Sequence, residues 1–147
     1  MPVYGPEGNG WKNPSAEKIR ELLEKARTVA VVGLSSRLGR PSLGVAQYLQ
    51  TRGYRIIPVN PREETILGEK SYPDLKSIPD KIDIVDVFRR SREAYDIVEQ
   101  AIEIGVGAVW LQESVVSPEA FKKGDEAGLI MVMDRCMYKE HRHLLPG

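Results

Sequence analysis

Serine and arginine side chains gather between Gly33 and Ser42, directly after the apolar run from Thr28 to Val32. This segment reaches Pro41, where the sequence predicts the start of a helix. The free amides and positive dipole of a helix start bind phosphate, and hydroxyl groups and arginines strengthen such a site. An ordinary turn with solvated arginines is an equally good interpretation, because the G-x-G-x-x-G spacing of dinucleotide sites is absent. The candidate phosphate-binding residues are Gly33, Leu34, Ser35, Ser36, Arg37, Arg40, Pro41 and Ser42.

A second candidate segment, Val59-Asn60-Pro61-Arg62, follows another apolar run. A nicotinamide site would have an acidic residue here to bind the ribose hydroxyls. An arginine instead favours a ribose that carries a phosphate. NADP and coenzyme A, with its 3′-phosphate, both meet this demand. The alternative is that Arg62 pairs with Glu63 or Glu64 on the surface.

Three arginines within four residues, Arg89, Arg90 and Arg92, follow a third apolar run that ends at Phe88. Positive charge at a helix start opposes the helix dipole, so this placement indicates a multiply anionic ligand, although solvated arginines are the simpler alternative. Phe88 is a candidate for stacking on adenine or for the core. A fourth polar segment, Gln112-Glu113-Ser114, follows the next apolar run.

Apolar runs alternate with helical patterns along the chain, which predicts parallel strands joined by right-handed helical crossovers. We therefore expect an α/β fold with a Rossmann-like, doubly wound, mainly parallel sheet of five or six strands. In such sheets ligands bind beyond the carboxyl ends of the strands, where all four polar segments lie. The predicted strands are 28–32, 55–59, 82–88, 108–111 and 129–133, with a short edge strand within 65–72. The predicted helices begin at Asn13-Pro14 and span 41–52, 91–104 and 118–127.

Length and composition limit the class of protein. The 147 residues suit one domain, which we expect at 13–147 after a flexible, glycine- and proline-rich arm at 1–12. Twenty-one basic residues balance 21 acidic residues, which argues against a nucleic-acid partner. We find no apolar stretch that suits a membrane span or a secretory signal, so we expect a cytoplasmic protein. The single cysteine cannot form an internal disulfide bond.

An ordered set of motifs resembles the stand-alone CoA-binding proteins, whose domain is similar to the N-terminal domain of the succinyl-CoA synthetase alpha subunit. The resemblance implies coenzyme A or an acyl-CoA as ligand. It also implies that the 33–42 loop holds the pyrophosphate and that the 59–62 turn holds the phosphorylated ribose. Phe88 and Arg89 would flank the adenine, and Gln112 and Glu113 would lie near the pantetheine. The motifs are Ala30-Val31-Val32-Gly33-Leu34-Ser35, Arg40-Pro41-Ser42, Val59-Asn60-Pro61-Arg62, Asp86-Val87-Phe88-Arg89, Val109-Trp110-Leu111-Gln112 and Asp134-Arg135-Cys136.

Catalysis has weaker support in the sequence than binding. The chain ends at Gly147, without the second domain that gives the synthetase its phosphorylated histidine, so we expect no ligase activity from this chain. Cys136, Glu140, His141 and His143 could form a nucleophilic or metal site, but we expect them to be structural. Cys136 would pack near the last strand, and the other three would lie on a terminal turn. Asp83 and Asp86 would point to opposite faces of one strand, which disfavours a carboxylate pair.

Two functions therefore remain open at the level of sequence. The favoured one is a non-catalytic module that binds coenzyme A, with a homodimer or an acyl-CoA enzyme as candidate partner. The alternative is an NADP-dependent oxidoreductase that uses the same crevice, although we see no separate substrate domain in the sequence to support it.

Overall fold

A computed structural model describes residues 10–146, whose centre is a single five-stranded sheet. All neighbouring strands are parallel, in the order β2-β1-β5-β6-β7, which confirms the predicted Rossmann-like α/β fold. The strands are short and apolar, as expected where both faces are buried. They are β1 (Thr28–Val32), β2 (Arg55–Val59), β5 (Ile84–Val87), β6 (Ala108–Leu111) and β7 (Ile130–Val132).

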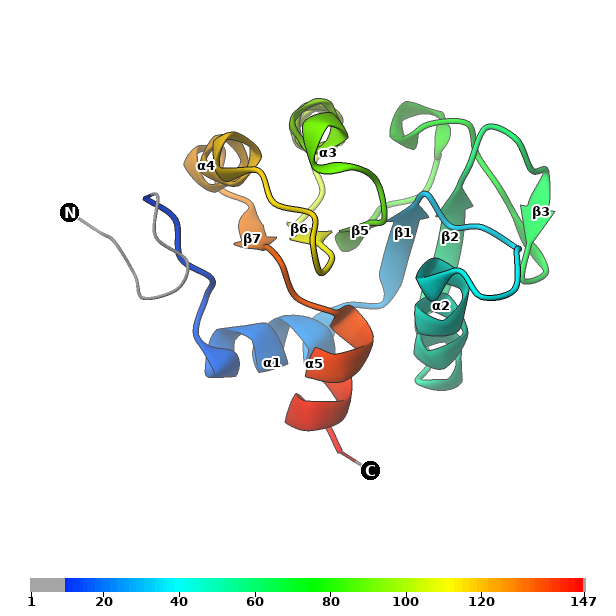
Figure 1. Ribbon diagram of the computed structural model, residues 1–147, viewed down its shortest axis with the longest axis horizontal. Coiled ribbons are helices and arrows are strands. Elements are labelled where there is room, and N and C mark those ends of the chain that lie inside the picture. Colours follow the sequence, from blue (N-terminus) through cyan, green and yellow to red (C-terminus); the bar gives the residue numbers. More distant parts are fainter. Residues whose placement is uncertain (1–9, 147) are drawn as a thin grey trace.

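Helices cover both faces of the sheet (Figure 1). Helices α1 (Ala16–Lys25), α2 (Pro41–Thr51) and α5 (Met137–Leu144) lie on one face, and α3 (Ala94–Ile104) and α4 (Pro118–Glu126) lie on the other. Successive residues of a strand point to opposite faces, so Val31 packs in one apolar cluster and Ala30 in the other. The sheet is therefore packed between two apolar cores.

The strand order reverses between β1 and β5. The chain leaves β1 through α2 to reach β2 on one side, whereas β5 leads through α3 to β6 on the other side. The loops that follow β1 and β5 lead to helices on opposite faces of the sheet. Open α/β sheets bind ligands at such a reversal of strand order. Gly33 ends β1 with φ +88°, and a Cβ atom there would lie 2.3 Å from the carbonyl oxygen of Phe88. Only glycine allows the two loops to approach this closely.

The first helix starts later than the sequence predicts. Ser15, and not Asn13-Pro14, caps α1, because its side chain accepts a hydrogen bond from the amide of Lys18. Asn13 is buried and binds the backbone of Met133 instead: its Nδ2 donates to the carbonyl (2.9 Å), and its Oδ1 accepts from the amide (2.8 Å). Asn13 therefore lies before the helix, because its side chain bonds to a residue 120 positions away in the sequence.

Two further elements differ from the prediction. The segment within 65–72 is a small antiparallel hairpin of β3 (Thr65–Ile66) and β4 (Glu69–Lys70), after which Tyr72 pairs with the end of β2. The C-terminal segment expected to be a turn is helix α5, which packs against α1 and α2. Short 3₁₀ turns at Leu75–Ser77 and Ser91–Glu93 complete the fold.

Residues 1–9 of the expected flexible arm lie outside the described residues, as does residue 147. Trp11 is buried and its ring packs on Phe121 of α4 with the ring centroids 5.3 Å apart, so the packed region already includes Trp11. Within residues 10–146, every helix is too short or too polar to cross a membrane.

Candidate functional site

A large cavity opens where the strand order reverses. Its volume is about 1180 Å³, above the usual range for a small-molecule site, so it suits an extended ligand. All four predicted segments contribute to its walls: the loop after β1, the turn after β2, the loop after β5 and, through Ser114, the segment after β6. The predicted site residues that line it are Gly33, Ser35, Ser36, Arg37, Arg40, Asn60, Pro61, Arg62, Phe88, Arg89 and Arg90.

The lining of this cavity is strongly basic. It includes six arginines and only two carboxylates, Glu63 and Glu93, in a chain whose net charge is zero. Arg89 is paired with Glu93, with 2.7 Å between its Nη2 and Oε1. The other five arginines form no ion pair with any residue in the described range 10–146. Their charges are available to an anion, and several uncompensated arginines in one concave surface concentrate negatively charged ligands. These five are Arg37, Arg40, Arg62, Arg90 and Arg92.

Hydrogen bonds fix the loop after β1 at the start of α2. The side chain of Ser42, in the first turn of α2, accepts from the amide of Ser35 (3.1 Å), and Ser35 Oγ accepts from the amide of Arg37 (3.1 Å). The first turn of α2 contains no acidic residue. The positive end of the α2 dipole therefore adds to the charge of the arginines around the cavity.

The turn after β2 is tied to the same loop. Asn60 Nδ2 donates to the carbonyl of Leu34 (2.9 Å), and Asn60 Oδ1 accepts from the amide of Arg62 (2.8 Å). The amide of Gly33 donates to the carbonyl of Val59 (2.9 Å). Leu34 and Val59 are both buried and line neither this cavity nor the smaller one beside it, so the structure limits their expected contribution to their backbone.

Glu63 is an acidic residue within the basic cavity that the sequence prediction left out of the site. Its carboxylate accepts hydrogen bonds from the Ser36 amide (3.2 Å) and from Ser36 Oγ. These two bonds hold the pKa of Glu63 below its ordinary value, so it is a carboxylate at neutral pH. The alternative interpretation of Arg62, a surface pair with Glu63 or Glu64, is not found among the residues described.

A second, smaller cavity adjoins the first on the side of β6 and α5. Its volume is about 420 Å³, and both cavities share Gly33, Ser35, Arg40 and Phe88 in their walls. An elongated ligand could therefore extend from one into the other. The predicted site residues that line only the smaller cavity are Pro41, Ser42, Gln112 and Glu113; Cys136 lines it as well.

A buried carboxyl group lies behind the smaller cavity. Asp86, on β5, is fully buried, and its Oδ1 accepts from Nε2 of Gln112 at 2.6 Å. Oδ2 has no hydrogen-bond partner among the described residues. Burial raises the pKa of Asp86 to about 7, and the Gln112 hydrogen bond opposes this rise. Asp86 thus positions the side-chain amide of Gln112, which lines the cavity. The sequence feature that indicates this buried pair is an acidic residue within an otherwise apolar strand.

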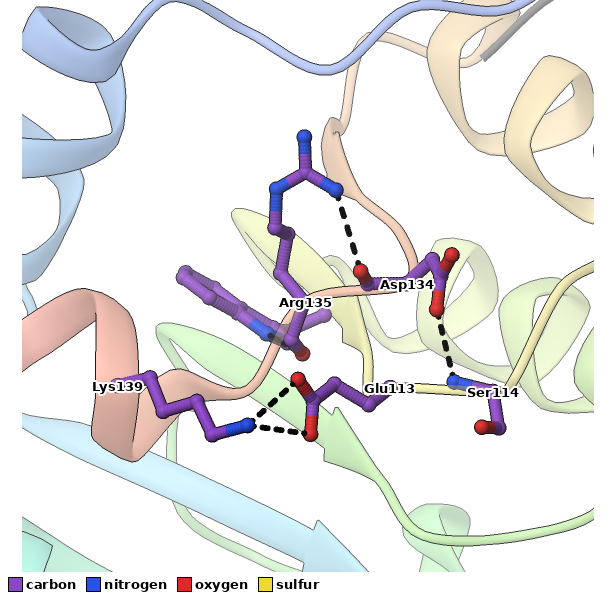
Figure 2. A network of polar contacts seen from close by, with 6 residues as sticks. Glu113, Ser114, Asp134, Arg135 and Lys139 are labelled. Atoms are coloured by element: carbon purple, nitrogen blue, oxygen red, sulfur yellow. Dashed lines mark hydrogen bonds and ion pairs between the residues drawn. The ribbon is translucent and has the colours of Figure 1, made fainter. Parts of the chain in front are cut away.

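A polar network fixes the start of α5 beside the smaller cavity (Figure 2). Asp134 Oδ1 accepts from the amide of Ser114 (2.8 Å), and both residues have positive φ, at +59° and +73°. Lys139 of α5 pairs with Glu113, with Nζ 2.9 Å from Oε2. The carbonyl of Arg135 accepts from the indole of Trp110 (2.9 Å). These contacts hold the segment before α5 against the loop after β6.

The candidate nucleophile and metal residues of the C-terminus do not gather at one point. Cys136 lines the smaller cavity, whereas His141 is buried between α5 and α2, where its Nδ1 lies 2.8 Å from the hydroxyl of Tyr48. Burial, followed by the charge of Arg52, lowers the pKa of His141, as expected for a neutral packed imidazole. Across residues 10–146, no three His, Cys, Asp or Glu side chains are grouped so that they could hold a metal ion.

A Rossmann-like sheet with an arginine-rich crevice at its strand-order reversal defines a class of domains suited to extended anionic ligands. Residues 27–142 match the CoA binding domain family, and the chain belongs to this family. The resemblance noted in the sequence is thereby confirmed.

Relatives of the whole chain are small proteins of about the same length. The chain is 41% identical over 130 residues to the uncharacterized protein YneT of Bacillus subtilis strain 168, covering 88% of this chain and 96% of YneT. A hypothetical protein from Pyrococcus horikoshii OT3 superimposes with a TM-score of 0.88 at 43% identity, covering 93% of this chain and 99% of that structure.

One relative is a much larger enzyme. The ADP-forming acetate–CoA ligase II of Archaeoglobus fulgidus is 29% identical over 102 residues, which make up 68% of this chain but only 15% of the ligase. The similarity therefore concerns one domain of that enzyme.

Proposed function

We propose that this protein binds coenzyme A or an acyl-CoA in the two joined cavities, as a binding module without catalysis of its own. The observation that carries the proposal is the basic cavity at the β1–β5 reversal, with five unpaired arginines among the described residues. Coenzyme A carries a pyrophosphate and a 3′-phosphate, so it offers several anionic groups to these arginines. Membership of the CoA binding domain family supports the same ligand.

The two cavities suit chemically different parts of such a ligand. The larger cavity, with its arginines and the start of α2, suits the phosphates and the adenosine. The smaller cavity has no arginine in its walls except Arg40, which it shares with the larger one, and it suits the pantetheine chain. Gln112 and Glu113 line that cavity, and Phe88 lies where the cavities join. A partner enzyme that uses acyl-CoA, or a second copy of the chain, belongs to the same proposal.

Calorimetric titration tests the proposal. We expect saturable heat when the purified protein is titrated with CoA and acetyl-CoA. NADPH and NADH are the comparison ligands, because an NADP-dependent oxidoreductase would bind NADPH in the same crevice. Saturable heat with NADPH and none with either CoA species would overturn the proposal in favour of that alternative.

Arg62 provides a sharper test of how the ligand lies. If its guanidinium binds the 3′-phosphate, Arg62→Ala should weaken CoA roughly tenfold or more, since a hydrogen bond to a charged group is worth about 1.5–3 kcal/mol. Dephospho-CoA, which lacks that phosphate, should be affected far less. Arg20→Ala is the matched control, because Arg20 lies on α1 and lines neither cavity. Equal weakening of CoA and dephospho-CoA would show that Arg62 does not bind the 3′-phosphate.

A further inference from the structure

Glu63 makes contacts of the kind that a phosphate group would make in this cavity. Its two carboxylate oxygens accept from the backbone amide and the hydroxyl of Ser36, in the loop after β1. A third donor, Asn60 Nδ2, lies 3.4 Å from Oε2. A backbone amide, a hydroxyl and a side-chain amide are the neutral donors that bind phosphate oxygens in loops at helix starts.

The choice of partners is unexpected for this carboxylate. Six arginines line the same cavity, and arginine is the strongest partner for a carboxylate because it can donate two parallel hydrogen bonds. Even so, Glu63 forms no ion pair with an arginine in the described part of the chain. It bonds instead to the loop that the proposed function assigns to the pyrophosphate, and it joins the turn after β2 to the loop after β1.

We propose that Glu63 and the pyrophosphate of the ligand compete for the same donors of Ser36, so that Glu63 lowers the affinity of the site for pyrophosphate-bearing ligands. This inference rests on the proposed function. One N–H group makes a short, straight hydrogen bond to a single acceptor, so the carboxylate must leave Ser36 before a phosphate oxygen can bind there. Glu63 thereby determines how strongly charged a ligand must be to enter.

The competing interpretation has the opposite sign. Acidic residues near the end of the second strand of nicotinamide sites accept hydrogen bonds from ribose hydroxyls. A Glu63 that stayed in place and bound a hydroxyl of the ribose would strengthen binding, and its removal would weaken it. The direction of the change in affinity therefore decides between competition and recognition.

The test is a calorimetric titration of four proteins, wild type, Glu63→Ala, Glu63→Gln and Glu64→Gln, with CoA and with inorganic pyrophosphate. Competition predicts that Glu63→Ala binds both probes about threefold or more tightly, the scale of an exposed charged contact, and that Glu63→Gln lies between it and the wild type. Glu64→Gln removes the same charge from the adjacent, exposed position, where no side-chain contact to Ser36 is formed. It should change affinity less, and only at low salt, because a long-range effect is screened.

Each outcome decides the inference. Equal or weaker binding of both probes by Glu63→Ala overturns it, as does an equal gain in Glu64→Gln that disappears at high salt. If wild type does not bind CoA but pyrophosphate binds more tightly to Glu63→Ala, the coenzyme assignment fails and the competition stands. If no variant binds either probe, both fail. A crystal structure of the CoA complex adds an independent readout: Ser36 should donate to a phosphate oxygen, with Glu63 turned away.

Discussion

Replacing the buried Asp86 by asparagine should make the protein more stable at alkaline pH and nearly unchanged at acidic pH. The Asp86 carboxyl has an ordinary pKa of 3.8 and a pKa of about 7 in the folded protein, because burial disfavours its charged form. Its pKa is raised by folding, so its contribution to stability is fully present below pH 3.8 and is lost as pH rises toward 7. Asparagine keeps the shape and the acceptor for Gln112 but does not ionise.

The magnitude follows from the two pKa values. In the unfolded chain the Asp86 carboxyl loses its proton above about pH 4, whereas in the folded chain it keeps the proton until about pH 7. At high pH this difference makes wild type about 4 kcal/mol less stable than the same chain with a neutral side chain. Between about pH 5 and pH 8 the advantage of Asp86→Asn should grow by roughly 2–3 kcal/mol. For a domain of this size that corresponds to a rise in the Tm difference of about 5–10 °C.

Denaturant and thermal unfolding of both proteins across this pH range measure the difference. Other titrating groups are the same in both proteins and cancel; His141, whose lowered pKa makes wild type less stable as pH falls, is one of them. Asp125→Asn, at an exposed position on α4, is the matched control for the loss of one carboxylate. A stability difference for Asp86→Asn that stays constant with pH would refute the reasoning, because it would mean that Asp86 has an ordinary pKa.

Two other substitutions test how the site is held. Gly33→Ala should destabilise the protein by at least about 2 kcal/mol in denaturant unfolding, since it adds a contact with Phe88 to the strain of positive φ. Gly53→Ala, at φ +91° with nothing within 4 Å of the added Cβ, isolates the strain alone, and equal losses would show that the contact with Phe88 is unimportant. Asn13→Ala should cost about 2–3 kcal/mol, because it removes two buried hydrogen bonds and leaves the amide of Met133 without this partner. A loss below about 0.5 kcal/mol would show that water replaces Asn13 easily.

Local patterns in the sequence were enough to predict the strands and most helices. The bounds of β1 and β2 agree with their apolar runs, because a strand buried on both faces needs a continuous apolar segment. The parallel arrangement of the strands also brings the four polar segments together without any further information. This is a general property of parallel sheets, in which all carboxyl ends lie at one edge.

Features that depend on distant partners could not be predicted. The local sequence predicts that Asn13 begins a helix, whereas its observed position follows from its hydrogen bonds to Met133. The contact of Glu63 with Ser36 depends on the conformations of the turn after β2 and the loop after β1, which bring two residues 27 positions apart within hydrogen-bond distance. The side-chain pair of Asp86 and Gln112 likewise depends on the register of β5 against β6, in which Asp86 lies opposite Trp110. Sequence separation hides all three from any local rule.

Other parts of the same chain bind one outer strand of the sheet, β2, and the residue that follows the other outer strand, β7. On β2, Pro58 has no N–H to offer, and its carbonyl accepts from the amide of Tyr72 (3.0 Å). Beyond β7, the amide and carbonyl of Met133 are taken by the side chain of Asn13. An incoming strand from another molecule would have to displace these groups before it could pair along β2 or continue past the end of β7, which disfavours edge-to-edge aggregation at these places.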